Sequence, residues 1–259
     1  TDLDLIILAT ATPDTPVPPG SAWLHHHLGA TNAAAMDLSA ACSGFLFAMH
    51  TGAAMVRSGM HRNVLVVGAE TLTRITDYTD RATCILFGDG AGAAVLRQQG
   101  YLNLLYSKVG TDSSGRELIT VLAGGSREPA SAETVANKRH YLRLQGREVF
   151  RRAVETMTRS GEEALEALGM KVSDLAWLVP HQANLRITQA VASQFDLPTE
   201  RVVGDMSVTG NTSAASLPIA LNGLQSSGRL KPGDRIMLVA FGAGLTWACQ
   251  VYENTGVPK

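Results

Sequence analysis

The chain has 259 residues, of which 45% are apolar and 17% are charged, and its formal net charge is −1. This composition is typical of a folded protein with a sizeable core, and it excludes the strongly basic surface of a nucleic-acid coat or membrane-surface protein. Three widely spaced cysteines, Cys42, Cys84 and Cys249, argue against a disulfide framework or zinc site, and no apolar run reaches the roughly 20 residues that span a bilayer. We therefore expect a cytoplasmic protein with no metal, no nucleic-acid partner and no membrane segment.

Strands and helices alternate at the start of the chain. Residues 3–10, 35–38 and 63–68 are short apolar runs typical of buried parallel strands, and a helix is expected over 21–28, ending at Gly29. This order predicts an α/β domain with helical layers on its sheet. Because the chain opens on a strand without an initiator methionine, we expect its N-terminus to be cleaved or incomplete.

Cys42 stands where the second predicted strand gives way to a helix that ends near Arg57. Gly44, Ala48 and Gly52 recur every fourth residue and form a smooth, buried stripe on that helix. Unpaired N–H groups and the helix dipole favour an anion at such a start, and they can lower a cysteine pKa from about 8.5 to roughly 3.5–7.5. We therefore predict a reactive thiolate, although a lone cysteine in apolar surroundings is more often a small core residue, which is our interpretation of Cys84 and Cys249.

The middle of the chain has less regular patterning. Residues 83–87 and 93–96 are strand-like and flank Gly88-Asp89-Gly90-Ala91-Gly92, which we interpret as a turn between antiparallel strands, because a dinucleotide loop would precede a helix. Residues 101–140 are polar and irregular, which indicates a loop or a cap over a tunnel. We expect an N-terminal half at 1–100, a connecting region at 101–140 and a C-terminal half at 141–259.

The C-terminal half begins with a predicted helix over 149–168, which stops at Gly169. A strand over 175–179 follows and runs into His181, and the last buried strand is expected at 236–240. Between them, a helix begins at Asn211 and ends near Gly228.

The same order of elements occurs twice, at an offset of about 170 residues. Cys42 and Asn211 then begin equivalent helices, and a pseudo-twofold axis would bring both helix starts to one centre. His181 leaves the carboxyl end of an adjacent strand, which is the usual mouth of an open α/β sheet. The first half lacks the helix and strand that open the second, so we expect that a strand-and-helix unit is absent from the front of this chain.

Each polar candidate also has a purely structural interpretation. His181 is compatible with a satisfied buried histidine, and Asn211 with a helix cap. His25, His26 and His27 are adjacent, so on a helix they point to different faces and make a poor metal clamp.

Three separated blocks favour the functional interpretation. They are His181-Gln182-Ala183-Asn184-Leu185-Arg186-Ile187, Gly210-Asn211-Thr212-Ser213-Ala214-Ala215-Ser216 and Phe241-Gly242-Ala243-Gly244-Leu245-Thr246-Trp247. Together with Cys42, they make the chain resemble the β-ketoacyl-acyl-carrier-protein synthase III family of the thiolase fold over essentially its whole length. This resemblance implies a five-layer αβαβα fold built from two similar halves, without the family's first strand-helix unit, which helps to bind coenzyme A. It also implies a homodimer.

The resemblance assigns roles by position. Cys42 resembles the acylated nucleophile, and His181 and Asn211 resemble the pair that handles the malonyl group. Phe241 resembles the family's aromatic gate, and the Ala243 N–H resembles a second oxyanion-hole donor beside that of Cys42. The remaining matches are Arg81, Phe150, Ala183 and Asn184 for coenzyme A and its pantetheine arm, Phe87 for the acyl pocket, and Arg151 and Arg186 for docking of the acidic carrier protein. Ala82, Arg147 and Ala248 depart from the family pattern.

The implied function is the decarboxylative condensation of an acyl-CoA primer, such as acetyl-CoA, with malonyl-acyl carrier protein. The product is a 3-oxoacyl-acyl carrier protein, the reaction initiates fatty-acid synthesis, and an acyl-cysteine intermediate makes the kinetics ping-pong. A histidine and an asparagine suit the decarboxylation, because they donate hydrogen bonds to an enolate without a full charge. No permanently bound cofactor is expected. A polyketide-priming ketosynthase, an acyltransferase on the same fold and an inactive truncated scaffold are the alternatives.

Overall fold

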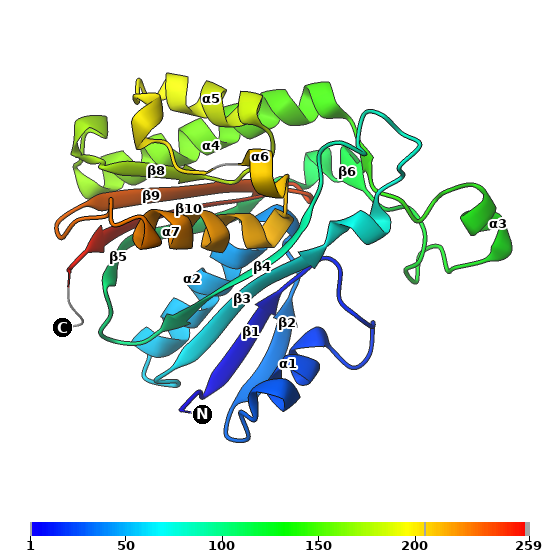
Figure 1. Ribbon diagram of the computed structural model, residues 1–259, viewed down its shortest axis with the longest axis horizontal. Coiled ribbons are helices and arrows are strands. Elements are labelled where there is room, and N and C mark those ends of the chain that lie inside the picture. The colour runs from blue at the N-terminus through cyan, green and yellow to red at the C-terminus, as the bar shows by residue number, and fades with distance from the viewer. Residues whose placement is uncertain (1, 205, 257–259) are drawn as a thin grey trace.

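Two four-stranded sheets alternate with three layers of helices (Figure 1). The computed structural model describes residues 2–204 and 206–256. One outer layer holds α4 (Gly146–Leu168) and α5 (Leu185–Gln194), the central layer holds α2 (Gly44–Arg57) and α7 (Ser216–Ser226), and the other outer layer holds α1 (Gly20–Leu28). The five-layer αβαβα fold expected from the sequence is confirmed.

The first sheet has the strand order β2-β1-β3-β4. Its strands are β1 (Leu5–Ala9), β2 (Ala34–Leu38), β3 (Val64–Thr71) and β4 (Asp89–Leu96). β1 pairs in parallel with β2 and β3, and every residue of β1 is buried, which is why it reads as a continuous apolar run. The three predicted strands and the helix ending at Gly29 are confirmed, with small differences at their ends.

The second sheet has the order β5-β10-β9-β8. Its strands are β5 (Leu102–Thr111), β8 (Trp177–Pro180), β9 (Arg235–Gly242) and β10 (Thr246–Asn254). Two expectations are wrong in this sheet. The strand at 236–240 is not the last, because the chain turns at 243–245 and returns antiparallel as β10. The segment 101–140 is not irregular throughout, because β5 pairs along the whole of β10.

The glycine-rich run 88–92 is also not a turn. Most of it lies inside β4, antiparallel to β3, while 83–86 forms turns rather than a strand and Phe87 makes an isolated bridge to Asn211. The glycines allow the other half of the protein to approach. A Cβ at Gly92 would lie 2.8 Å from the Pro218 side chain, and one at Gly90 would lie 3.0 Å from Ile219. α7 therefore packs directly on the backbone of β4.

The two halves support one another through a reciprocal contact at the centre. α2 and α7 each follow a 3-10 turn, η1 (Ala41–Ser43) and η6 (Ser213–Ala215), and the first residue of each turn is left-handed, with φ of 47° and 48°. Gly242, at the end of β9, lies against the backbone of Cys42 in η1, and Gly68, in β3, lies against the backbone of Ala214 in η6. A strand of each half thus packs against the 3-10 turn of the other half.

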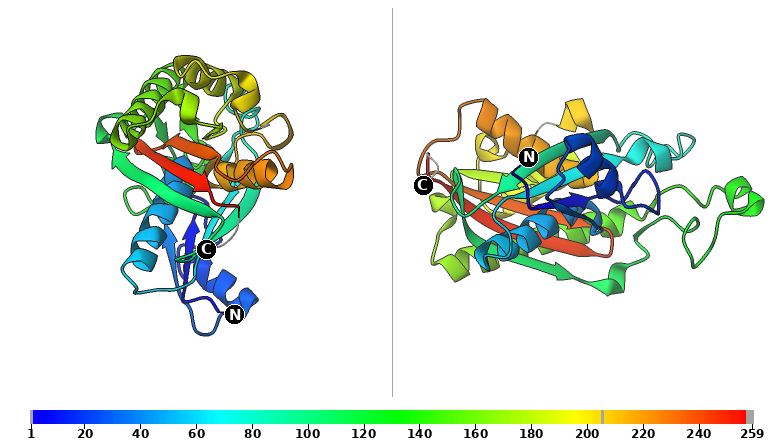
Figure 2. Two further views of the ribbon diagram at one scale, coloured as in Figure 1. Left: turned by 90° about the vertical axis from the view of Figure 1, so that its left-hand side faces the viewer. Right: turned by 90° about the horizontal axis from the view of Figure 1, so that it is seen from below.

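The remaining elements are short: β6 (Ile119–Thr120), β7 (Arg143–Leu144), α3 (Ala132–Ala136) and α6 (Met206–Thr209). Residues 121–142, which include α3, form an arm that projects from the body (Figure 2). Its base is fixed because Lys138 pairs with Asp77 at 3.1 Å and the Leu142 N–H donates to the Ile75 carbonyl at 2.7 Å. Among the described helices, none combines the length and apolar character needed to cross a membrane.

Candidate active site

A cavity of about 550 Å³ lies where the two halves meet. Cys42, His181 and Asn211 all line it, so the structure brings together the three residues that the sequence singled out. No Asp, Glu, Lys or Arg is among its lining residues in the described part of the chain. Much of the wall is apolar, and these side chains belong to Leu72, Ile75, Leu86, Phe87, Ile119, Val121, Leu142, Leu144, Val149, Met157, Ile187 and Phe241.

Cys42 lies in η1, immediately before α2. The left-handed Ala41 turns the chain sharply before it, and the close approach of Gly242 leaves the Cys42 backbone no room to move away. The nucleophile candidate is therefore held by both halves of the protein.

The predicted lowering of the thiol pKa is not what the structure indicates. Burial raises the pKa of the Cys42 thiol to about 11, a hydrogen bond with Ser213 lowers it, and the nearby Glu70 carboxylate raises it further. Burial outweighs the helix start because removing a thiolate from water penalises the charged form. The Cys42 thiol is therefore mostly protonated at neutral pH.

His181 follows β8 and is 1% exposed. Its Nδ1 lies 2.6 Å from the Ser216 hydroxyl, and its Nε2 is buried without a partner among the described residues. Burial lowers the pKa of His181 to about 4, so the ring is neutral at neutral pH. When the Ser216 hydroxyl donates to Nδ1, the ring proton resides on Nε2, and that N–H is the group available to a bound molecule.

Asn211 is fixed on three sides. Its backbone N–H donates to the Leu86 carbonyl at 2.8 Å, its carbonyl accepts from the Gly88 N–H at 3.0 Å, and its Oδ1 accepts from the Ser213 N–H at 2.9 Å. Since Oδ1 is engaged, the amide nitrogen is the part of the side chain that remains to donate into the cavity. The site thus contains one neutral N–H donor from each of two neutral side chains.

Several other predicted residues line the same cavity: Phe87, Ala183, Asn184, Phe241 and Ala243. Ala243 comes one residue after Gly242, whose backbone touches that of Cys42, so the two predicted oxyanion-hole residues are neighbours in space. Asn184 has a second, structural task, because its side chain accepts from the Ile187 N–H at 2.9 Å and caps α5.

Phe150 is not among the residues that line this cavity; it lines an adjoining open pocket, and Gly146 borders both, so its place in the pantetheine tunnel stays a prediction. Val149, Ala153 and Met157 recur every fourth residue on the cavity side of α4, and Phe150 is turned away by about 100° and is 37% exposed. The predicted arginines also lie outside. Arg81 is exposed beside the lining residue Ala82.

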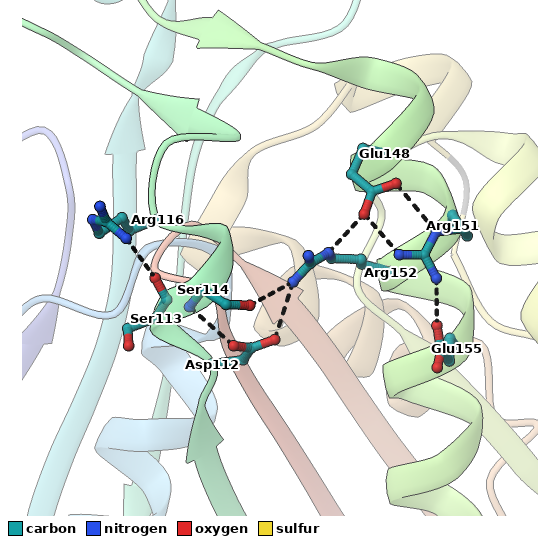
Figure 3. Close-up of polar contacts among 8 residues, drawn as sticks. All are labelled: Asp112, Ser113, Ser114, Arg116, Glu148, Arg151, Arg152 and Glu155. Carbon is teal, nitrogen blue, oxygen red and sulfur yellow. Dashed lines mark hydrogen bonds and ion pairs between the residues drawn. The ribbon is translucent and has the colours of Figure 1, made fainter.

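The two arginines assigned to carrier docking differ in their surroundings. Arg151 pairs with Glu148 at 2.7 Å and with Glu155 at 2.9 Å (Figure 3). Arg186 is exposed in the first turn of α5 and has no carboxylate partner among the described residues. Beside Arg151, Arg152 connects α4 to Asp112 at 3.1 Å, and Asp112 lies directly between β5 and η3 (Ser113–Gly115). Hydrogen bonds from Arg151 and Arg152 hold the pKa of Glu148 at about 2.

The sequence analysis missed three polar residues around the site. Ser216 holds His181, Ser213 contacts Cys42, and Glu70 is a buried carboxylate bonded to Ser213. Both serines lie in the same sequence block as Asn211, and hydroxyl side chains so close to a predicted active-site residue were the available signal. Glu70 is the only charged residue at the carboxyl end of the apolar strand β3, and that contrast was the available signal.

Cys249 is completely buried in β10, whereas Cys84 is partly exposed in a turn. The core interpretation is therefore confirmed for Cys249 and not for Cys84. In the described part of the chain, no three His, Cys, Asp or Glu side chains gather closely enough to hold a metal ion.

Chemically, the cavity combines one sulfur nucleophile with two neutral hydrogen-bond donors in apolar surroundings. A thiol forms and breaks thioesters readily, and neutral donors stabilise an enolate or oxyanion without attracting a carboxylate as strongly as a cation would. The arrangement is suited to acyl transfer through a covalent thioester.

Two family models match the chain. The model "3-Oxoacyl-[acyl-carrier-protein (ACP)] synthase III" matches residues 36–113, and the model for the C-terminal part of the same enzyme matches residues 165–254. Together they contain Cys42, His181 and Asn211.

Individual relatives give the same result. The chain is 47% identical over 254 residues to the β-ketoacyl-[acyl-carrier-protein] synthase III of Desulfitobacterium hafniense (strain Y51), which covers 97% of this chain and 76% of that protein. The structure of β-ketoacyl-[acyl-carrier-protein] synthase III from Thermus thermophilus superposes with a TM-score of 0.89 at 41% identity, covering 97% and 77% of the two chains. The priming β-ketosynthase of the R1128 polyketide biosynthetic pathway gives a TM-score of 0.84 at 38% identity, covering 97% and 75%.

Proposed function

Because the chain belongs to the 3-oxoacyl-[acyl-carrier-protein] synthase III family, we propose that it joins an acyl-CoA primer to malonyl-acyl carrier protein and so initiates fatty-acid synthesis. The product is a 3-oxoacyl-acyl carrier protein, and carbon dioxide and free coenzyme A are released. The reaction is an acyl transfer in two stages with one covalent intermediate, which predicts ping-pong kinetics.

In the first stage, the Cys42 sulfur attacks the thioester carbonyl of the primer, and the coenzyme A sulfur leaves. The backbone N–H groups of Cys42 and Ala243 are our candidates for the oxyanion hole, since both residues line the cavity and are neighbours across the contact with Gly242. Losing one such donor typically costs about 10²–10³ in rate. The acyl chain then occupies the apolar part of the cavity, beside Phe87.

In the second stage, the malonyl thioester loses carbon dioxide, and the resulting enolate attacks the acyl-Cys42 carbonyl. His181 Nε2–H and the Asn211 amide are our candidates for donating to the thioester oxygen of that enolate. Their neutrality matters, because a cation beside the malonyl carboxylate would stabilise the charged reactant and oppose the loss of carbon dioxide. The low pKa of His181, about 4, keeps the ring uncharged under ordinary conditions.

The observation that carries the proposal is the meeting of Cys42, His181 and Asn211, from distant parts of the chain, in one cavity whose described lining residues include no Asp, Glu, Lys or Arg. The test is intact-mass analysis after incubation with acetyl-CoA. We expect one acetyl adduct of about 42 Da, absent in Cys42→Ala. Addition of malonyl-acyl carrier protein should then discharge the adduct and yield a 3-oxoacyl product. A folded wild-type chain that forms no adduct would support the inactive scaffold instead.

A polyketide-priming ketosynthase is the second candidate, because the priming β-ketosynthase of the R1128 pathway shares 38% identity and a TM-score of 0.84 with this chain. Both activities use the same chemistry and differ in the primer and in the carrier protein that receives the product. Competition between acetyl-CoA and longer or branched acyl-CoA primers, with the adduct identified by mass, separates them.

We further propose that the protein acts in the cytoplasm as a homodimer, uses acyl-CoA as a substrate and keeps no permanently bound cofactor. For the carrier protein, we propose Arg186 as the main docking cation, because Arg151 is already engaged by two glutamates. Arg81 is proposed to contact coenzyme A at the rim, next to the lining residue Ala82. We also propose that the chain is organised as an N-terminal half at 1–100 and a C-terminal half at 141–259, joined by the connecting region 101–140.

A further inference from the structure

Thr246 is a buried threonine that the two stages above do not use. It begins β10, is one of the residues that line the cavity, and is 8% exposed. Its hydroxyl donates to the Ala40 carbonyl at 2.9 Å and lies 3.1 Å from the Ala243 carbonyl. A hydroxyl has one proton, so these two acceptors share it. One side chain thus joins the turn that contains Cys42 to the turn that follows β9.

A second hydrogen bond runs beside the first in the opposite direction. The Ser43 hydroxyl donates to the Thr246 carbonyl at 3.2 Å, and Ser43 is completely buried. Ser43 directly follows Cys42, and Ala40 stands two residues before it, so the two hydrogen bonds flank the nucleophile. The Ala40 carbonyl also accepts from the Ser43 N–H at 3.2 Å, which closes the turn. The first residue of β10 is therefore bonded to both ends of the Cys42 turn.

These two turns contain the N–H groups proposed above for the oxyanion hole. In the described part of the chain, neither the Cys42 N–H nor the Ala243 N–H donates a hydrogen bond to another residue. Folded proteins leave few N–H groups without an acceptor, so both groups are available to an oxygen in the cavity. Gly242 limits their separation from one side, because a Cβ built on it would lie 2.7 Å from the Cys42 nitrogen.

An oxyanion hole is effective only when its donors are aligned before charge forms on the oxygen. When a sulfur attacks a thioester or ester carbonyl, negative charge develops on the carbonyl oxygen, and each aligned donor contributes about 10²–10³ in rate. Here the two donors come from opposite halves of the chain. Their alignment therefore depends on the contacts that join the two turns, and Thr246 supplies a hydrogen bond to each.

We propose that Thr246 is a positioning residue for the acylation of Cys42, an inference that rests on the proposed function. Its hydroxyl holds the Cys42 turn and the Ala243 turn together, so that both N–H groups are directed at one carbonyl oxygen. Thr246 acts through these turns and forms no bond to the acyl group. Its effect is confined to reactions in which a carbonyl oxygen becomes charged.

The test compares two reactions of Cys42, measured by peptide mass so that Cys84 and Cys249 are counted separately. p-Nitrophenyl acetate acetylates the thiol through a charged carbonyl oxygen and contains no coenzyme A. Iodoacetamide alkylates the thiol by displacing iodide from a saturated carbon, which requires the same thiolate and no oxyanion hole. The ratio of the two rates therefore measures the oxyanion hole separately from the ionisation and exposure of the sulfur.

Thr246→Val keeps the branched shape of the side chain, and Thr246→Ala removes the hydroxyl without placing a methyl group against the Ala40 carbonyl. In both variants, acetylation should slow about 10- to 100-fold, whereas alkylation should change less than about twofold. Thr246→Ser keeps the hydroxyl, so its acetylation rate should stay within about threefold of the wild-type rate.

Thr111→Val is the matched control. Thr111 pairs with Thr246 across β5 and β10 and is exposed, and its hydroxyl makes no hydrogen bond among the residues that the structure describes. The same substitution at this position should leave both rates unchanged. The free energy of unfolding, measured in urea, confirms that each variant is folded.

The inference is overturned if Thr246→Val is acetylated like the wild type, if acetylation and alkylation slow in parallel, or if Thr246→Ser is as slow as Thr246→Ala. Acetyl-CoA, tested on the same samples, keeps this outcome separate from the function. A wild-type protein that reacts with the nitrophenyl ester but not with acetyl-CoA, with the expected ratios in the variants, refutes the synthase alone. A wild-type protein acetylated by acetyl-CoA, with an unchanged ratio in Thr246→Val, refutes the role of Thr246 alone. A wild-type protein acetylated by neither donor overturns both.

Discussion

Replacing Gly242 by alanine tests how closely the second half of the protein holds the nucleophile. A Cβ at this position would lie 2.7 Å from the Cys42 nitrogen and 3.1 Å from the Cys42 Cβ. Both are atoms of a fixed turn and not the end of a flexible side chain. To restore an ordinary contact near 3.4 Å, the two segments must separate by about 0.7 Å.

The expected cost follows from that displacement. Overpacking of this kind destabilises a protein by about 1–3 kcal/mol, and a shift of nearly 1 Å in a reacting group lowers a rate by roughly 10²-fold. We therefore expect Gly242→Ala to lower the free energy of unfolding in urea by about 1–3 kcal/mol and to slow Cys42 acetylation by about two orders of magnitude. Gly68→Ala, at the reciprocal contact with Ala214, should destabilise the protein similarly.

Gly223→Ala is the matched control. Gly223 lies inside α7, and nothing is within 4 Å of a Cβ built on it. Alanine is the better helix former there, so the variant should gain up to about 1 kcal/mol and keep its activity. If Gly242→Ala unfolds and is acetylated like the wild type, the reasoning about the contact between the halves is refuted.

Four further predictions concern His181, Ser216 and the docking arginines. His181→Ala should still form acetyl-Cys42 but fail to decarboxylate malonyl-acyl carrier protein, and an unchanged rate of carbon dioxide release would contradict its role. Because burial lowers the pKa of His181 to about 4, its stabilising contribution is complete above its usual pKa of about 6.5 and is lost as pH falls from there to about 4. Over this range the free energy of unfolding in urea should fall by at most about 3 kcal/mol, and His181→Gln should remove that pH dependence. Ser216→Ala should slow decarboxylation more than acetylation, since Ser216 orients the ring; equal slowing of both would argue for a structural role alone. Arg186→Glu should raise KM for malonyl-acyl carrier protein, more at low salt than at high salt, whereas Arg151→Glu should change it less; the reverse order would favour Arg151 as the docking residue.

Local pattern was sufficient for the elements whose burial is uniform or periodic. β1 is buried along its whole length and reads as an apolar run, and α4 has a buried stripe and ends at the left-handed Gly169. The three active-site candidates were also within reach of the sequence, because each lies in its own short block. Their meeting in one cavity follows from the internal repeat, which places η1 and η6 at one centre.

The failures arise where a residue's role depends on a distant partner. The glycines of β4 resemble a turn because the reason for them is α7, more than 120 residues later in the chain. β5 resembles a polar loop because its regularity comes from pairing with β10.

The largest electrostatic error explains how the two stages of the reaction are linked. A helix start predicts a thiolate, but the same burial that keeps His181 neutral also keeps the Cys42 thiol protonated. Decarboxylation benefits from this exclusion of charge, and nucleophilic attack is hindered by it. A site that serves both steps therefore requires a way to create a thiolate without introducing a second charge. The Glu70 carboxylate adds to the hindrance, because its charge raises the pKa of the Cys42 thiol further.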